Sequence, residues 1–234
     1  MWIWHQMDFP HLNWNKVRYL IRQGASSLSK KDTVTKSVVL VISLLNASHA
    51  LGIDNLNFPF KKHYEIYTVT GSNADEIEHA FNHDRPDHLK QKGFDGYTAW
   101  TYDFHTNDHS CELYEFSLAV TYTLPQIVVS DTSLEAAEEF RAYIEKLYRH
   151  EQVHCALTVK SMHDIFTAFT NGRDSNCSKA NRRVIALQSE LITNNEKFDI
   201  YTAHGEIELA NSPFGEEGYL KYCDIPFDPI VILK

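Results

Sequence analysis

Two histidines and a glutamate stand at a spacing that can bind a metal ion and use it. In the segment LYRHEQVHCALTVK, residues 147–160, the pattern His-Glu-x-x-His is formed by His150, Glu151 and His154. Two histidines four residues apart on a helix project in nearly the same direction, so both imidazoles can reach one Zn2+ at about 2.0 to 2.1 Å. The glutamate then lies beside the open coordination position, where it can take a proton from an attacking water and return it to a leaving amine. The pattern predicts a zinc-dependent peptidase with Glu151 as the base.

The pattern needs support from its surroundings, because about one shuffled chain in twenty with this composition contains it by chance. The alternative is a buried histidine pair satisfied by backbone carbonyls or acidic groups. The motif lies on the apolar stripe of a predicted helix, and burying Glu151 there without a cation or donor is costly. This placement favours a metal site. The apolar residues of the stripe recur at helical spacing: Phe140, Ile144, Leu147, Leu157 and Ile165.

The helix that carries the motif is the best-defined element of the chain. We expect it to run from about Ser133 to Ala168, because Thr132 and Glu135 form a capping box and acidic residues fill the first turns. A second helix is predicted over KANRRVIALQSELITNNEK, residues 179–197. The residues that follow are predicted to form a tail that wraps the domain.

A small sheet is expected beside these helices. Alternating patterns predict strands over HYEIYTVTG, residues 63–71, over Tyr97–Thr106 and over Cys111–Pro125. The turn-forming residues NDHS join the last two strands as an antiparallel hairpin. A helix over residues 73–83, capped by Asn73, follows the first strand.

The charge distribution divides the chain and limits its partners. The formal charge of −9 becomes −13 beyond residue 50, because residues 1–50 carry six Lys or Arg against two acidic residues. Such an acidic domain excludes nucleic acid or an anionic membrane as the main partner, since both need basic patches. We therefore interpret residues 1–33 as an extension, either a fused remnant or a mis-called start, and residues 51–234 as the functional domain.

Residues 34–50 have the pattern of a signal peptide. A short basic segment precedes ten mostly apolar residues, Val38–Ala47, and small residues follow up to Ala50. The apolar run is too short to span a bilayer, which needs about 20 residues, so no stable membrane insertion of the mature chain is expected. The alternative is a buried strand in VVLVI. The pattern predicts a secreted or periplasmic protein cleaved near Ala50.

The cysteines lack the Cys-x-x-Cys spacing of a cysteine-only zinc cluster or a redox pair. In an exported protein a disulfide is expected, and Cys111 with Cys177 is the predicted pair. Cys155 follows His154 but points about 100° away from it on a helix, so it is predicted to be a core residue.

The region from about His63 to Gly205 resembles a bacterial family of domains of unknown function that are predicted to be secreted zinc-dependent proteases. The matching features are YTVTG, YTAWTYDF, CELYEFSLAVTYTLP, HEQVH and, further along, FDIYTAHG at residues 198–205. This chain has Phe198 where the family usually has Tyr, and EIELAN where it usually has a Gly-Ala pair. With the predicted elements, the resemblance implies an α+β, zincin-like fold in which a small antiparallel sheet packs against the motif helix and the second helix.

The first 30 residues resemble the N-terminal segment of some Fic-type proteins. The His-Pro-Phe signature of Fic enzymes is absent from the chain, so their nucleotide-transfer activity is not implied.

The resemblance makes His204 the third predicted zinc ligand, and Gly205 leaves that loop free to turn back onto a helix. Glu190 on the second helix is the next choice. His163 is the last, because its distance of nine residues from His154 places it on the opposite face and about 13 Å along the helix axis.

Two residues near His204 have weaker predicted roles. Tyr201 is predicted to donate a hydrogen bond to the oxyanion of the reaction, or else to be a packed loop aromatic. Asp199 either orients a ligand histidine or caps a turn.

The predicted function is hydrolysis of peptide bonds in a peptide or protein substrate, with Zn2+ as cofactor. An exposed strand such as Tyr97–Thr106 would hold the extended substrate. The alternatives are a non-catalytic envelope binding module with a structural zinc, and an envelope protein without a metal.

Overall fold

The computed structural model describes residues 55–107, 112–171 and 177–233, which belong to one compact unit, Leu51–Lys234. The predicted extension over residues 1–33 and the predicted signal over residues 34–50 lie outside the described residues.

A four-stranded sheet forms one layer of this unit. Its long central strand is β3 (Leu113–Ser130). The strand β1 (Phe60–Val69) pairs with β3 in parallel, β2 (Tyr97–Thr106) pairs with it antiparallel, and β4 (Ile230–Leu233) pairs in parallel with its last residues. The predicted antiparallel pairing of β2 with β3 is confirmed, while residues 108–111, which join the two strands, lie outside the described part of the chain.

The predicted small antiparallel sheet of a zincin-like fold is wrong. Two of the three pairings, β1 with β3 and β3 with β4, are parallel. Alternation of buried and exposed residues has the same period in both kinds of sheet, so it indicates a strand but not the direction of its neighbour. The residues between β1 and β2 form two helices, and β3 then inserts between the two strands.

The length of β3 also differs from the prediction, which ended this strand at Pro125. Proline has no N–H group to donate to a sheet. Pro125 lies between the residues of β3 that pair with β2, up to Thr123, and those that pair with β4, from Ile127 onward. Pro125 itself pairs with Tyr67 of β1 on the opposite edge, and the strand continues past the proline at a point where neither β2 nor β4 pairs with it.

Two short helices connect β1 to β2. The helix α2 (Ala74–His83) begins at Asn73, whose side-chain oxygen accepts a hydrogen bond from Glu76 N at 3.0 Å, as predicted. Pro86 then precedes α3 (Asp87–Lys92), which ends at Gly93 in the left-handed conformation.

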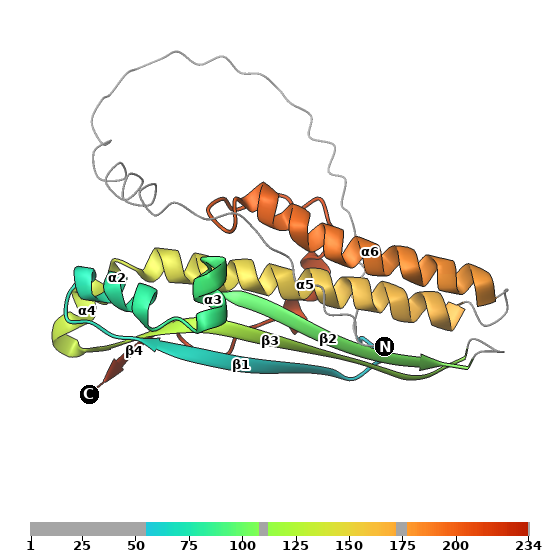
Figure 1. The fold of residues 1–234 in the computed structure, drawn as a ribbon, viewed down its shortest axis with the longest axis horizontal. Coiled ribbons are helices and arrows are strands. Elements are labelled where there is room, and N and C mark those ends of the chain that lie inside the picture. Colours follow the sequence, from blue (N-terminus) through green and yellow to red (C-terminus); the bar gives the residue numbers. More distant parts are fainter. Residues whose placement is uncertain (1–54, 108–111, 172–176, 234) are drawn as a thin grey trace, which may run out of the picture. The chain divides into compact units, whose positions relative to one another are not determined.

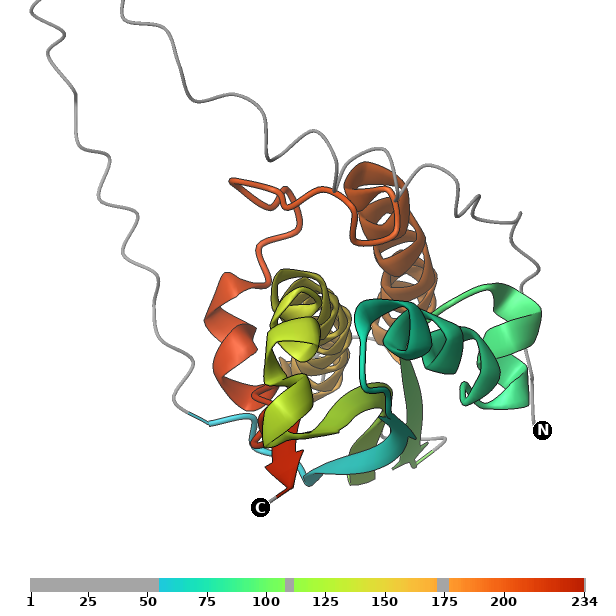
Figure 2. The ribbon, with the colours of Figure 1, turned by 90° about the vertical axis from the view of Figure 1, so that its left-hand side faces the viewer.

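Two long antiparallel helices form the second layer, α5 (Arg141–Asn171) and α6 (Cys177–Thr202). Figures 1 and 2 show them side by side on one face of the sheet. The predicted single helix from Ser133 is wrong at its start: the 3-10 turn η2 (Asp131–Ser133) and α4 (Leu134–Glu138) precede a break before Arg141. No side-chain capping bond is present at Ser133, which is the N-cap of α4.

The second predicted helix, α6, extends further than its sequence pattern predicted, so it includes Asp199.

The core between the helices and the sheet is built from the inward residues of β3 and the apolar stripe of α5, including Leu118, Val120, Tyr122, Ile144 and Met162. The motif residues lie on the same apolar stripe of α5, so they are buried with this core.

The chain after α6 packs along α5 through the 3-10 helix η3 (Glu217–Tyr222). A disulfide joins Cys155 of α5 to Cys223, with 5.8 Å between the Cα atoms. Cys155 is fully buried, as predicted for a core residue, but its bond to Cys223 was not predicted. Cys111, in the predicted pair with Cys177, lies outside the described residues.

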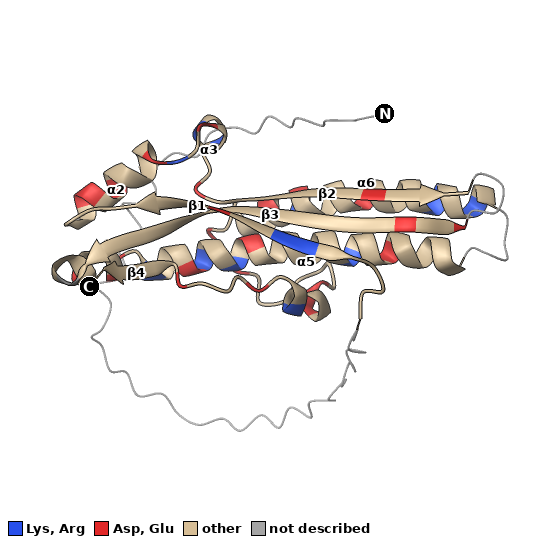
Figure 3. Cartoon of the chain, turned by 90° about the horizontal axis from the view of Figure 1, so that it is seen from below, with Lys and Arg blue, Asp and Glu red and all other residues tan. Residues whose placement is uncertain are grey.

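Acidic and basic residues are interspersed along α5 (Figure 3).

Among the described residues, no helix combines the length and the hydropathy needed to cross a membrane.

Candidate metal centre

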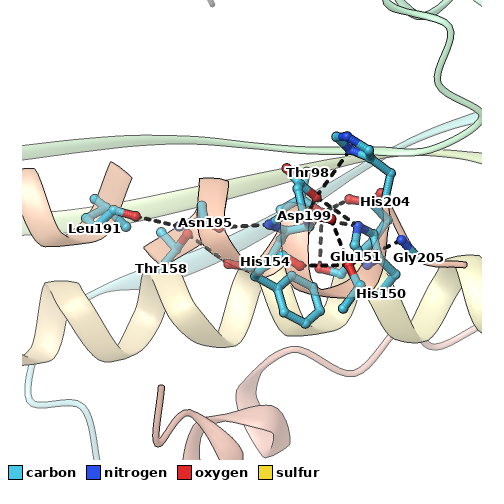
Figure 4. A network of polar contacts seen from close by, with 12 residues as sticks. Thr98, His150, Glu151, His154, Thr158, Leu191, Asn195, Asp199, His204 and Gly205 are labelled. Carbon is cyan, nitrogen blue, oxygen red and sulfur yellow. Dashed lines mark hydrogen bonds and ion pairs between the residues drawn. The ribbon is translucent and has the colours of Figure 1, made fainter. Parts of the chain in front are cut away.

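Three ligand atoms from α5 and α6 converge at one point. His150 Nε2 and His154 Nε2 lie 3.1 Å apart, and Asp199 Oδ1 lies 3.2 Å from the first and 2.9 Å from the second. Figure 4 shows the three side chains meeting between the two helices. Among the described residues, these three are the group of His, Cys, Asp and Glu arranged to hold a metal ion.

The spacing of these atoms fits a small metal ion. Bonds of about 2.0 to 2.1 Å at tetrahedral angles separate neighbouring ligand atoms by about 3.3 Å. The three observed separations lie between 2.9 and 3.2 Å, slightly below that value. Two imidazoles and one carboxylate leave a fourth position open for water or substrate.

The orientation of His154 is set by Asn195, four residues before Asp199 on α6. The Asn195 amide nitrogen donates to Leu191 O at 2.8 Å, so its Oδ1 faces His154 Nδ1, also at 2.8 Å. Because an amide oxygen only accepts, Nδ1 of His154 carries a proton. In the neutral ring, Nε2 then presents a lone pair to the carboxylate of Asp199.

His150 is held by packing. Its ring stacks on Phe198, with 4.9 Å between centroids. Gly205 lies close to the Cβ, Cγ and Nδ1 atoms of His150. A Cβ at Gly205 would come within 3.2 Å of His150 Cγ. The Nδ1 atom of His150 is buried and has no hydrogen-bond partner among the described residues. Phe198 also meets His154 edge-on at 5.1 Å, so this aromatic ring forms a wall of the site.

Glu151 is buried and held from the sheet. Thr98 of β2 donates a hydrogen bond to Glu151 Oε2 at 2.7 Å, and both side chains are almost fully enclosed. Gly96, just before β2, lets the strand lie close to α5. A Cβ at this position would lie 3.0 Å from Leu147 Cδ1 and 3.3 Å from Glu151 Cγ. The motif glutamate is thus positioned by a strand that precedes it by some fifty residues.

The electrostatics of the site favour positive charge at the convergence point. Burial disfavours the charged form of His154, but the hydrogen bond and charge of Asp199, together with Glu151 and Asn195, raise its pKa to about 9. Burial likewise disfavours the carboxylate of Asp199, yet the two histidines hold its pKa well below the usual range.

The other predicted site residues lie at different distances from this point. His204 lies beside it, with Nδ1 3.9 Å from Asp199 Oδ1. Tyr201 is half exposed and its ring stacks on Phe214, with 5.9 Å between centroids. Glu190 faces Arg183 on the exposed side of α6, and His163 meets the Tyr219 hydroxyl at 2.8 Å.

Sequence reasoning did not assign Asp199 as a ligand. Asn195, Asp199 and Thr202 follow Leu191 at helical spacing, which was a usable signal, because all four would share one face if the helix continued. The prediction ended that helix at residue 197 and treated FDIYTAHG as a loop.

The chain matches a known protein family. Residues 64–205 match the model of a family described as "Bacterial protein of unknown function (DUF922)". No curated protein and no solved structure matches the chain. Thr98, the motif residues, Asp199 and the turn at His204 all lie inside the matched range.

Proposed function

The chain belongs to this bacterial family of unknown function, and we propose that its domain is a zinc-dependent peptidase. In this proposal His150, His154 and Asp199 bind the metal, and Glu151 is the general base. Asp199 takes the place that the sequence assigned to His204.

The observation that carries the metal is the contact between His154 Nε2 and Asp199 Oδ1, at 2.9 Å. Asn195 fixes a proton on Nδ1 of His154, so Nε2 can meet the carboxylate only through a second proton or a cation. Burial disfavours the charged ring, but Asp199 raises the pKa of His154, so the site favours positive charge between the two atoms, and a metal ion can take the place of the second proton. His150 Nε2 completes the same triangle, so the cation would have three ligands instead of two.

Zinc suits this donor set, since imidazole and carboxylate groups are its ordinary ligands in catalytic sites. A bound Zn2+ would lower the pKa of a coordinated water to about 7 and polarise a carbonyl group.

The residues of the chain then perform the proton transfers. Glu151 accepts a proton from the water whose oxygen attacks the carbonyl carbon of the peptide. When the bond from that carbon to nitrogen breaks, Glu151 returns the proton to the leaving amine. The second proton of the water also passes to the amine, so the products are a carboxylate and an ammonium group. Thr98 holds the Glu151 carboxylate in one orientation throughout.

The substrate position is supported by the place of β2. This strand pairs with β3 on one side, and its residue Thr98 touches Glu151. On its other side β2 pairs with no strand of the described residues, and an extended peptide added there would pass close to the base.

The test compares Glu151→Gln with the wild type in the purified full-length chain. Zinc content is measured by elemental analysis, and cleavage of a synthetic peptide library is followed by mass spectrometry. We expect one zinc per chain in both proteins and cleavage by the wild type alone. Glu145→Gln is the matched control, because Glu145 lies on the same helix and pairs with Arg141 away from the site.

Each opposite result has a defined meaning. Equal cleavage by the Glu151→Gln variant contradicts the role of Glu151. A wild type that binds zinc and cleaves no peptide contradicts the peptidase and leaves a structural zinc. A wild type without zinc contradicts the metal centre itself.

A further inference from the structure

His204 lies at a backbone turn of unusual conformation. Ala203, His204 and Gly205 have φ angles of 48°, 56° and 86°, so three successive residues are left-handed and two of them carry side chains. Residues other than glycine rarely adopt this conformation, and such outliers gather at functional sites. Hydrogen bonds from His204 N to Asp199 O and from Ile207 N to Thr202 O, both 2.8 Å, hold the turn.

The turn places the His204 imidazole beside the metal centre but outside its ligand triangle. Its Nδ1 lies 3.9 Å from Asp199 Oδ1, beyond the 2.9 to 3.2 Å that separate the three ligand atoms from one another. The group of atoms that lie within 4.8 Å of one another does not include His204.

Exposure increases in the direction of His204. The side chains of His150 and His154 are 7% and 11% exposed, Asp199 is 21% exposed and His204 is 27% exposed. His204 therefore lies on the more exposed side of the site, from which a substrate can approach. The His204 ring also faces Phe94, with 5.8 Å between centroids, so it forms part of the rim of the site.

We propose that His204 is a catalytic residue that donates a hydrogen bond to the carbonyl oxygen of the scissile peptide bond, and is not a metal ligand. This inference rests on the proposed peptidase function. An imidazole carries at least one N–H in either neutral tautomer, so the ring is a donor in both. Donors aimed at the oxygen on which negative charge develops contribute about 10²- to 10³-fold to kcat.

Tyr201 is less well placed for this role, for which the sequence suggested it. It follows Asp199 by two residues, which is about 200° around the helix axis. Its ring stacks on Phe214, and 49% of the residue is exposed.

The experiment uses zinc-loaded full-length chain carrying His204→Ala or His204→Gln. Zinc affinity is measured by competition with a chelator, kcat and KM with a cleaved peptide, and binding with a phosphinic peptide, which imitates the tetrahedral geometry of the reaction. We expect zinc affinity within about threefold of wild type and kcat reduced by about 10²- to 10³-fold in His204→Ala. Phosphinic peptide affinity should fall by a similar factor, with KM little changed.

The conservative variant and a control sharpen the result. His204→Gln keeps an N–H donor, so it should recover part of kcat and of phosphinic peptide binding. His88→Gln is the matched control, because His88 is exposed on α3, and it should behave as wild type.

Four outcomes overturn the proposal. A fall in zinc affinity of more than about 100-fold in His204→Ala would make His204 a ligand, since even loss of a partner behind a ligand costs only about 10- to 100-fold. An unchanged kcat in that variant would remove its catalytic role. A greater loss of kcat in Tyr201→Phe than in His204→Gln would assign the donor to Tyr201. Absence of cleavage by the wild type would remove the proposed function, and this inference with it.

Discussion

A buried carboxylate and a partly buried one in this domain are compensated in different ways. Asp95, between α3 and β2, forms an ion pair with Arg85, with 2.8 Å between Oδ1 and Nη1, and also accepts a hydrogen bond from the Tyr143 hydroxyl. Asp199, on α6, faces imidazoles, and its Oδ1 contacts His150 and His154.

The difference shows which cluster can exchange its positive charge for a metal ion. At Asp95 the chain supplies the positive charge through a guanidinium that is always protonated. At Asp199 the facing groups are imidazoles, which carry positive charge only with a second proton, and a metal ion can take that proton's place. The first cluster is therefore a structural ion pair and the second is suited to a metal. The two are connected, because Asp95 adjoins Phe94 and Gly96, which contact His204 and Glu151.

The largest effect on stability is expected from Asp95→Asn. This change leaves the Arg85 guanidinium buried without a counter-charge, which costs about 3–5 kcal/mol of unfolding free energy. Chemical denaturation measures this loss. Zinc affinity of the folded fraction should stay close to wild type. Glu138→Gln, which breaks the exposed pair with Arg141, is the control and should change stability far less.

Asp199→Asn should show the reverse pattern. Zinc affinity should fall by more than about 100-fold, because a ligand is lost and not only a partner behind a ligand. In wild type, zinc at 100 times its Kd should stabilise the fold by about 2.7 kcal/mol, and chelation should remove this gain. Thermal unfolding with zinc and with a chelator measures both. A zinc-dependent Tm shift of wild-type size in Asp199→Asn would contradict the ligand assignment.

Asn195→Ala should have an intermediate effect. Without the acceptor that holds a proton on His154 Nδ1, the ring is free to change tautomer and orientation. Zinc affinity is expected to fall about 10- to 100-fold, as for other groups that orient a ligand. Asn195→Asp keeps an acceptor and should restore most of the affinity. If both variants bind zinc as wild type does, Asn195 has no orienting role.

The smallest effect is expected from Gly205→Ala, compared with Gly93→Ala. Both glycines have positive φ, 86° and 72°, so each change should cost about 1–2 kcal/mol of stability through the backbone alone. The added Cβ has no atom within 4 Å at Gly93 but presses on His150 at Gly205. Only Gly205→Ala should therefore weaken zinc binding as well. Equal zinc affinity in the two variants would show that His150 accommodates the methyl group.

Local patterns predicted most of the elements but not how they pair. The alternation in HYEIYTVTG and in the β2 and β3 segments identified three strands, and the Asn73 cap identified α2. Neither pattern carries the direction of a neighbouring strand. The insertion of β3 between β1 and β2 depends on which buried faces fit together across the whole sheet. The Cys155–Cys223 bond likewise depends on where the tail returns to α5.

The sequence by itself determined that His150, Glu151 and His154 share the buried stripe of one helix, because helical periodicity is a local property. Only the tertiary structure decided what meets them. The helix α6, which packs on α5, extends through Asp199 and brings this residue to the two histidines. The strand β2 brings Thr98 to Glu151. Such contacts join residues some fifty positions apart. They depend on the burial of apolar surface between the elements, and no short motif encodes that burial.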